Sequence, residues 1–540
     1  MKWIGGALSL AHSSALAGPR LGWDPRRQPC VSVITCDGES KSVSLCELFQ
    51  ESEGLAAIAG GTPGETVAIV EFLLAVCFAA GECPASAGEW QRWVAERRGF
   101  TGAAAWLARQ SDGDWDMFDP LHPLGQNALL RESFEQSATG TAQLVIERAG
   151  DYLQFFDRHH LEDGESLSAA EAFRAVLTQH VYAPYGRGRI SGEKLGPAIT
   201  NLATGRLLGR IRVVALGETV GETLRLNLYP YAGEAGGLNT SWTTGSVVRR
   251  TFEAKARPRM PRNPADLHSA LGRSILLEGR LDEKQGPVVD RVLIGAGEVL
   301  ELDPERDMKD AVLSRTTAGL VKPLWPSPSR ALWQEAHALY AAVKDRQPGL
   351  YELLWSLPYE RTGMDVPYQL WAVGLIANKT LPVTWVEGCF PYAPGMAEHL
   401  YLASSRGSRI AEFLAIALRR AALVASQTVH SAKAPADEAA LVARYDARWR
   451  FWADAAEPFD KLLEKVADLD PDSPTAVVVE LVTEYAKDLR DMAREQLVQR
   501  LESLPPNDRG YRARARAMER YEDDVAGDNA PAEIRELVGP

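Results

Sequence analysis

Residues 397–430 read AEHLYLASSRGSRIAEFLAIALRRAALVASQTVH, and the apolar side chains in this stretch recur at three- to four-residue spacing. This period is typical of a long amphipathic helix with one buried face. Similar stretches follow at 436–468 and 474–503, separated by Pro435 and by Asp470-Pro471-Asp472-Ser473-Pro474, which end helices. With a helix expected at 329–346, or with one from the segment before it, they predict a four-helix bundle.

The chain before this region mixes helix and strand signals. Val31 to Thr35 and Val43 to Leu45 flank an Asp37-Gly38 turn, which predicts a hairpin. Further helices are expected at 45–50, 66–80, 87–110 and 168–180, the last capped by Ser166 or Ser168, and strands at 211–215, 273–278 and 288–294.

The predicted fold class is therefore α+β, a mixed α/β amino-terminal domain followed by a carboxy-terminal four-helix bundle. The tail is arginine-rich from Arg509 to Arg520 and then acidic, and it is interpreted as a solvated charged helix. The expected divisions are an extension at 1–18, an α+β domain at 19–390, a bundle at 391–504 and a charged tail at 505–540.

Composition limits the kind of partner. The chain has 540 residues, 46% of them hydrophobic and 24% charged, which predicts a globular protein of two or three domains. The net charge is −13, from 72 acidic against 59 basic residues. Because non-specific nucleic-acid binders neutralise phosphates over a broad basic face, any DNA contact here is expected to be local or shared with partners.

The cysteines and the first residues indicate the compartment. No pair among the six cysteines has Cys-x-x-Cys spacing, so we expect no zinc site, no cofactor and a reducing cytoplasm. The first 18 residues resemble a weak secretory signal, but Gly5, Gly6 and His12 break the apolar run. No apolar run reaches the roughly 18 residues of a membrane span, so no membrane partner is expected.

Several motifs occur in an order that resembles a known family. They are the Asp37-Gly38 hairpin with Val43-Ser44-Leu45, Asp116-Met117-Phe118-Asp119 with His122-Pro123-Leu124-Gly125-Gln126, Gly221 to Leu228, Arg330-Ala331-Leu332-Trp333, and Arg448 to Trp452 with Glu457-Pro458-Phe459. Together the chain resembles the CasA-type large subunit of the type I-E Cascade, the CRISPR RNA-guided surveillance complex.

The resemblance implies the same two-part fold and a function without catalysis. In that family the subunit recognises the protospacer-adjacent motif of invading double-stranded DNA, largely from the minor groove, and helps to open the duplex for guide pairing. The implied partners are the other Cascade subunits, the guide CRISPR RNA, the target double-stranded DNA and a helicase-nuclease. Because guide pairing reads most of the sequence, such a subunit touches few base pairs and tolerates an acidic charge.

The glycine-rich stretch from Ala183 to Arg189 is the first candidate contact. The resemblance implies that Gly186 and Gly188 let the backbone approach base edges, and Arg187 and Arg189 can pair with phosphates. The alternative is that these glycines form an ordinary surface turn.

The resemblance also implies a basic side chain in the groove and a wedge. Lys284 at the tip of the 273–294 hairpin is the candidate for the first, with Arg291 and Lys309 as others and a solvated lysine as the alternative. The wedge corresponds to the polar turn at 374–380, where relatives usually carry a glutamine. Here Asn378, Lys379 and Thr380 form the expected tip.

Two further segments are candidates for docking. The segment 151–161 resembles the loop that contacts the guide and neighbouring subunits, with burial of either phenylalanine in the core as the alternative. The basic run 249–262 indicates a loop that contacts phosphates or partners, or else a solvated linker. The residues are Phe155, Phe156, Arg158 and His159 in the first, and Arg249, Arg250, Lys255, Arg257, Arg259 and Arg262 in the second.

Two rival classes remain at this point. An enzyme could use Asp114, Asp116 and Asp119 with His122, but their setting among aromatic residues and proline suits a structural turn better. The other rival is a helical scaffold or adaptor that binds no nucleic acid.

Overall fold

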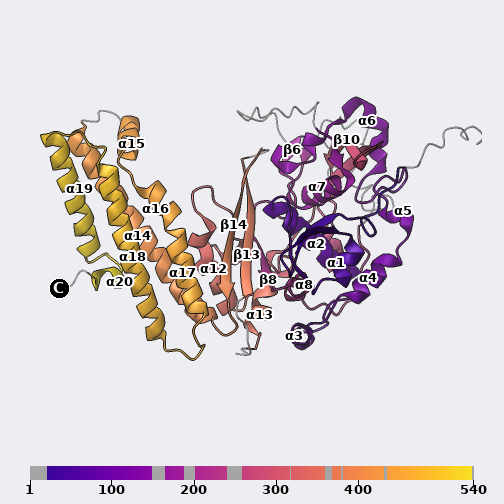
Figure 1. Cartoon of the computed structure of the whole chain (residues 1–540), viewed down its shortest axis with the longest axis horizontal. Helices are drawn as coiled ribbons and strands as arrows, with labels where there is room; N and C mark the ends of the chain where they lie inside the picture. Colours follow the sequence, from indigo (N-terminus) through magenta and orange to yellow (C-terminus); the bar gives the residue numbers. More distant parts are fainter. Residues whose placement is uncertain are drawn as a thin grey trace, which may run out of the picture.

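The computed structural model describes residues 21–148, 165–187, 201–239, 258–316, 318–358, 368–378, 381–430 and 435–537. Figure 1 shows an elongated molecule with a mixed body at one end, a bundle of helices at the other, and a long two-stranded ribbon between them. None of the helices in these ranges has an apolar stretch of the length that a bilayer crossing requires.

The mixed body contains both helices and strands, and its named strands pair antiparallel, as in the α+β class. In chain order the elements are β1 (Val31–Thr35), β2 (Ser40–Val43), α1 (Leu45–Gln50), β3 (Leu55–Ile58), α2 (Pro63–Ala79), α3 (Ala87–Ala95), α4 (Thr101–Ala108), α5 (Asp112–Trp115), η1 (Ala128–Leu130), α6 (Arg131–Ser137), β4 (Thr139–Gly140), η2 (Thr141–Gln143), η3 (Ile146–Arg148), β5 (Leu167–Ser168), α7 (Ala169–Tyr182), β6 (Gly186–Arg187), β7 (Asn201–Leu202), β8 (Arg212–Leu216), α8 (Val220–Asn227), α10 (Pro264–His268), β9 (Arg273–Asp282), β10 (Gly286–Ala296), α11 (Pro304–Asp307), β11 (Leu313–Arg315), β12 (Val321–Pro323), η4 (Leu332–Glu335), α12 (Ala336–Lys344), α13 (Leu350–Trp355), β13 (Tyr368–Asn378) and β14 (Leu381–Tyr392).

The carboxy-terminal part of the chain is helical. Its elements are α14 (Ala397–Val429), α15 (Pro435–Ala443), α16 (Arg448–Asp454), α17 (Ala456–Ala467), α18 (Thr475–Leu501), α19 (Asp508–Ala526) and α20 (Ala532–Arg535).

The amino-terminal hairpin and its helix confirm the prediction. β1 pairs antiparallel with β2 on one side and with β3 on the other. Gly38 in the turn has a φ of +84°, a conformation that favours glycine. Ser44 then caps α1 in a capping box with Glu47, so the hairpin is followed at once by the expected helix.

The single helix expected at 87–110 is wrong. The structure has two helices there, because Arg97 adopts a left-handed φ of 50° and ends α3. Phe100 between the two helices is fully buried, and α4 starts at the next residue. The amphipathic period continues across this break, so the sequence pattern could not reveal it.

Two sheets position the surfaces discussed below. β10 pairs along its length with β9 and, at its other edge, with the short strands β4 and β5. β13 lies between β8 and β14 in the second sheet. The strands expected at 211–215, 273–278 and 288–294 are therefore present, and Ser168 is the cap of α7.

The segment 374–380, expected as a polar turn, is mostly strand. β13 continues to Asn378 and pairs with β14 from Tyr368 to the hairpin end, where Asn378 faces Leu381. The apolar residues Leu375 and Ile376 are buried, and this burial favours strand over turn.

The bundle consists mainly of α14, α17, α18 and α19, with α12 packed against α14. The single helix expected at 436–468 is divided into α15, α16 and α17. The tail expected as a solvated helix from 505 is also corrected, because α19 packs along α14. It buries Gly510, Ala513, Ala517, Tyr521 and Val525 in the bundle core, while its arginines lie on the other face.

Candidate nucleic-acid interface

The glycine-rich stretch opens a small hairpin. Gly186 and Arg187 form β6, which pairs antiparallel with Leu202 and Asn201 of β7. Gly186 is half-buried, and a Cβ built on it would lie 3.5 Å from Leu202 Cδ1, an ordinary contact distance. The fold therefore sets no steric requirement for glycine at 186. Gly188 and Arg189 lie outside the described residues.

Backbone contacts and one buried arginine hold the base of this glycine hairpin. The Arg273 guanidinium, which is 2% exposed, donates hydrogen bonds to the carbonyls of Pro184 and Ala203 on its two limbs. Gly205 N donates to Ala183 O at 2.7 Å. A Cβ on Gly205 would lie only 2.5 Å from Val181 O, so this close backbone approach does require glycine.

The β13–β14 ribbon ends beside the same region. Asn378, the predicted wedge residue within the described range, is exposed at the end of β13, and a register shift between Ile376 and Ala377 precedes it. Lys379 and Thr380 lie outside the described residues. Figure 1 shows this end of the ribbon on the same side of the molecule as β6.

Trp385 joins the ribbon to the end of α7, four residues before Gly186. Its ring stacks edge-on against Tyr182, the last residue of α7, at a centroid distance of 4.8 Å. Its Nε1 donates to Glu147 Oε1 at 2.7 Å, and the ring lies so close to Gly64 that no side chain fits there. Trp385 pairs with Leu375 near the end of the ribbon. The structure thus brings together the segments around 186 and 378, and this contact was not predicted from the sequence.

The structure does not bring Lys284 to this place. Arg273, which holds the glycine hairpin, pairs with Ala296 at the base of the β9–β10 ribbon. Lys284 is exposed in the turn at the opposite end, next to Asp282. A strand of this length spans roughly 30 Å, so Lys284 cannot share one groove contact with Gly186 unless the nucleic acid spans that distance.

Arg259 and Arg262 differ sharply in what surrounds them. Arg259 donates to Asp266 at 2.7 Å and to Glu298 at 2.9 Å, and both carboxylates are buried. Burial raises the pKa of Glu298. For Asp266, burial would raise the pKa, but hydrogen bonds from Arg259 and from the Arg262 backbone, together with the charges of both arginines, lower it. Arg262 is 61% exposed and 3.5 Å from Asp266. Arg259 therefore holds two loops together, and Arg262 is available to a partner.

The remaining predicted contacts lie outside the described residues. They are Arg249, Arg250, Lys255 and Arg257 in the basic run, and Phe155, Phe156, Arg158 and His159 in the docking loop.

The acidic residues of the rival enzyme hypothesis form turns. Asp116 Oδ1 accepts hydrogen bonds from the backbone of Trp23 and Phe118 at 3.0 and 2.9 Å. Asp119 Oδ1 accepts from the backbone of Leu121 and His122, both at 2.8 Å. These bonds give both carboxylates a structural role. Within the described ranges, no group of three or more His, Cys, Asp or Glu residues could hold a metal ion.

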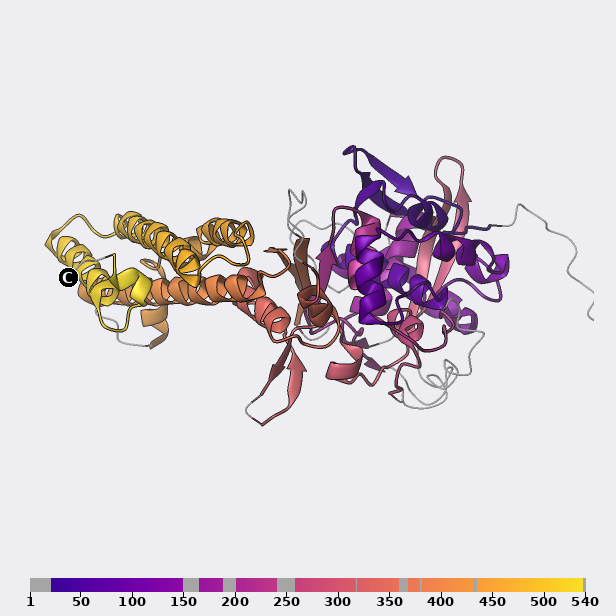
Figure 2. The same cartoon turned by 90° about the horizontal axis from the view of Figure 1, so that it is seen from below.

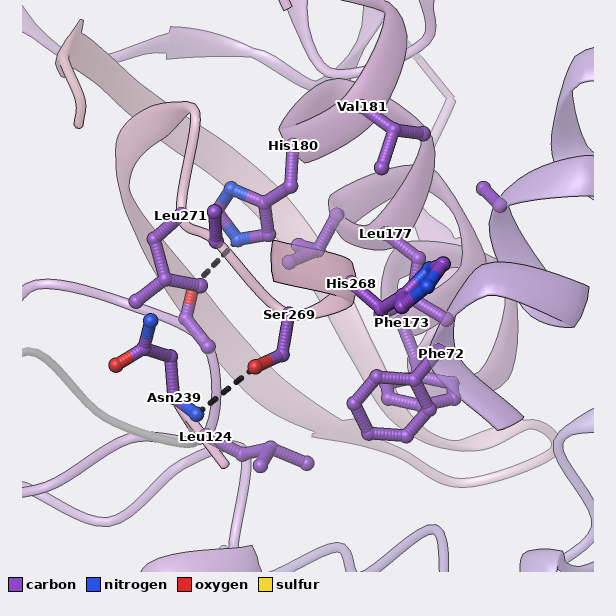
Figure 3. A pocket seen from close by; sticks show the side chains of 14 residues that line it. Phe72, Leu124, Phe173, Leu177, His180, Val181, Asn239, His268, Ser269 and Leu271 are labelled. Carbon is purple, nitrogen blue, oxygen red and sulfur yellow. Dashed lines mark hydrogen bonds between the residues drawn. The ribbon is translucent and has the colours of Figure 1, made fainter. Parts of the chain in front are cut away.

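A small pocket lies inside the mixed body, between α2, α7 and α10 (Figure 3). Its volume is about 30 Å³, and apolar side chains such as Phe72, Leu124 and Phe173 form most of the wall. His180 Nε2 donates a hydrogen bond to Gly125 O at 2.9 Å, and burial lowers the pKa of His180 to about 4. The imidazole is therefore neutral at physiological pH, and the pocket is part of the core.

Comparison with solved structures agrees with this architecture. The structure of Thermus thermophilus CasA (Cse1) superposes with a TM-score of 0.72 at 18% identity, covering 93% of this chain and 99% of that one. Cse1 from Acidimicrobium ferrooxidans gives 0.72 at 20% identity, covering 97% and 100%. A chain of a CRISPR RNA-guided surveillance complex gives 0.67 at 18% identity, covering 93% and 100%. No curated protein matches the chain.

These likenesses, all at or below 20% identity, show that the chain has the fold of CRISPR-associated Cse1 proteins. The model for CRISPR-associated protein Cse1 matches residues 27–496, so the chain belongs to the Cse1 family. The family predicted from the sequence is confirmed, and so is the α+β fold with its helical carboxy-terminal part.

Proposed function

We propose that this protein recognises the protospacer-adjacent motif of double-stranded DNA for a type I-E surveillance complex and helps to open the duplex. Its partners are the other Cascade subunits, the guide CRISPR RNA, the target DNA and a helicase-nuclease. The observation that carries the proposal is the contact between Trp385 and Tyr182, because it fixes the β13–β14 ribbon beside the end of α7, which leads into the glycine hairpin.

The contact surface consists of the glycine hairpin and the tip of the β13–β14 ribbon. Its residues are Gly186, Arg187, Gly188, Arg189, Asn378, Lys379 and Thr380. Small residues let a backbone approach base edges in the shallow groove, and the cations pair with phosphates. An inserted wedge costs a few kcal/mol of unstacking, which contacts with the opened strands offset.

The surrounding segments supply docking. Phe155, Phe156, Arg158 and His159 contact the guide or a neighbouring subunit, and Arg249, Arg250, Lys255, Arg257 and Arg262 contact phosphates or partners. Arg259 supports this second group indirectly, since its own charge is neutralised by Asp266 and Glu298. Lys284 is a separate contact, distant from the glycine hairpin along the β9–β10 ribbon.

The proposed function is binding, without catalysis by this chain. The carboxylates of Asp116 and Asp119, which an enzyme would use, accept hydrogen bonds from backbone N–H groups in turns. These bonds support a structural role. The bundle presents a separate face for the helicase-nuclease.

A single substitution tests the glycine hairpin. Gly188→Asp places a negative charge in the contact surface, so a guide-loaded complex containing this variant should lose motif-dependent binding in a gel-shift assay. Gly88→Asp is the matched control, because Gly88 is exposed on α3 with no neighbour within 4 Å of a built Cβ. Both variants should still assemble with the guide-loaded partners.

The same assay separates the alternatives. Equal DNA affinity of the two variants would remove the glycine hairpin from the interface. If the unmodified chain adds no motif-dependent affinity to the guide-loaded partners, the chain is a scaffold.

A further inference from the structure

A cluster of buried charges lies under the candidate interface. Glu71 of α2 is 1% exposed and accepts from Arg212 Nε at 2.8 Å and from His268 Nδ1 at 2.7 Å. Arg206, which is 5% exposed, donates to the same carboxylate. Three segments that are far apart in the sequence, around 71, 206–212 and 268, therefore meet at one side chain.

A second carboxylate extends the cluster. Asp310 accepts from Arg210 at 2.7 and 3.2 Å and lies 3.1 Å from Arg212 Nε. Burial alone would raise the pKa of Asp310, but Arg210 and Arg212 lower it well below its usual range. Arg210 and Arg212 therefore favour the ionised form of Asp310.

The cluster has an excess of positive charge. Three guanidinium groups face two carboxylates, and His268 adds no charge because burial and the nearby Arg206 and Arg212 lower its pKa well below the usual value. Several of its buried polar atoms also have no hydrogen-bond partner in the described part of the chain: Arg206 Nε, Arg210 Nε and His268 Nε2.

Such a cluster is not expected to increase the free energy of unfolding. Buried ion pairs often contribute nothing to the free energy of folding relative to apolar residues, and unpaired buried polar groups destabilise the folded state. Buried ionic groups are retained in some proteins because they fix one arrangement of the backbone. The arrangement that this cluster fixes is visible from the elements it connects.

The cluster connects both parts of the candidate interface. Arg206 follows β7, the returning strand of the glycine hairpin, and lies next to Gly205 at its base. Arg212 on β8 pairs with Val373 of β13, the strand that ends at Asn378. Glu71 lies on α2, whose second residue, Gly64, packs against Trp385. The β13–β14 ribbon, which carries Trp385, lies between the bundle and the mixed body in both views (Figures 1 and 2).

We infer that Glu71 is a positioning residue. Through Arg206 and Arg212, it holds the glycine hairpin and the β13–β14 ribbon in a fixed position relative to each other. It touches no nucleic acid. The expected effect of Glu71 on DNA recognition rests on the proposed function. Its effect on the relative position of the two hairpins does not.

The first test uses the isolated chain. Glu71→Gln keeps the shape and removes the charge, and we expect about tenfold faster amide hydrogen exchange in both 201–207 and 372–378. The comparison variant is Glu53→Gln, which removes the partly exposed carboxylate partner of another buried arginine, Arg225 of α8. The comparison variant should lower the unfolding temperature without faster exchange in either segment.

The second test uses the guide-loaded complex and a duplex containing the motif. Glu71→Gln should weaken binding about tenfold, whereas Glu53→Gln should stay within about twofold. Arg206→Gln serves as a second variant in case Glu71→Gln does not fold, because it removes the excess charge and should leave the unfolding temperature nearly unchanged. It should still raise exchange at 201–207.

The outcomes separate the inference from the proposed function. Exchange that rises only within α2 and α10, or rises equally in Glu53→Gln, overturns the positioning role. Unchanged exchange at 201–207 in Arg206→Gln also overturns it. A complex of the unmodified chain that shows no motif-dependent binding refutes the proposed function, while the exchange result still decides whether Glu71 couples the hairpins.

Discussion

Gly186→Ala tests whether the glycine hairpin approaches DNA. In the free protein the added methyl group would lie 3.5 Å from Leu202 Cδ1, an ordinary contact, and Gly186 does not need a positive φ. The substitution should therefore change the free energy of unfolding by less than about 0.5 kcal/mol. If the backbone at 186 contacts base edges closely, the same methyl group overpacks that interface at a cost of about 1–3 kcal/mol.

That cost converts into a measurable loss. Between 1 and 3 kcal/mol corresponds to roughly 5- to 150-fold weaker binding of the motif-containing duplex. The assay is a titration of that duplex with the guide-loaded complex, followed by gel shift or fluorescence anisotropy, together with thermal unfolding of the isolated chain. A duplex without the motif measures the background affinity.

Gly205→Ala is the contrasting variant. Its methyl group would lie 2.5 Å from Val181 O and 2.8 Å from Ala183 N, so the backbone must move and the protein should lose about 1–3 kcal/mol of stability. An unchanged DNA affinity in Gly186→Ala refutes the close approach at 186. A clear loss of stability in that variant would show that its effect on binding comes from misfolding.

Three further predictions follow from burial and charge. Trp385→Phe keeps a ring against Tyr182 but loses the hydrogen bond to Glu147, and chemical denaturation should show a loss of about 1 kcal/mol, against about 3 kcal/mol for Trp385→Ala. Because the folded state lowers the pKa of His180 to about 4, the unfolded chain binds more protons below its ordinary value of 6.5. The contribution of neutral His180 to the free energy of unfolding is therefore complete above pH 6.5 and declines as the pH falls toward 4. Urea titrations at different pH should show a loss of up to about 3 kcal/mol. The His180→Gln variant should show a flatter dependence on pH. Arg259→Ala leaves two buried carboxylates without their partner and should cost about 3 kcal/mol, whereas Arg262→Ala at an exposed position should change the unfolding midpoint very little.

The sequence patterns correctly predicted the helices and turns that depend on interactions between residues close in the sequence. The period of 397–430 gave α14 almost to the residue, and the Asp37-Gly38 turn gave the first hairpin. The apolar pattern did not reveal a buried helix face where that face consists of small residues. The buried face of α19 consists largely of Gly510, Ala513 and Ala517 between arginines, so its packing on α14 was hidden by its charge.

The sequence indicated which residues could belong to the candidate site, but it did not indicate how they are arranged in space. Glycines and arginines at 184–189 and the amide at Asn378 marked two loops, but nothing in the sequence relates Trp385 to Tyr182. The same limit applies to Arg273, which looks like one more strand arginine until its contacts with both limbs of the glycine hairpin are seen. Contacts between distant segments depend on tertiary packing, which single-residue patterns do not encode.

In the proposed function, an acidic chain selects DNA, and the internal use of arginine is consistent with this. Many cations that the composition counts as basic are committed to buried carboxylates or carbonyls, among them Arg206, Arg210, Arg212, Arg259 and Arg273. The proposed contact surface retains only a few, so its salt dependence would have a log–log slope near −3 for three engaged cations. Such a surface holds non-specific DNA weakly, and stable binding then requires the groove contacts and the guide-loaded partners together.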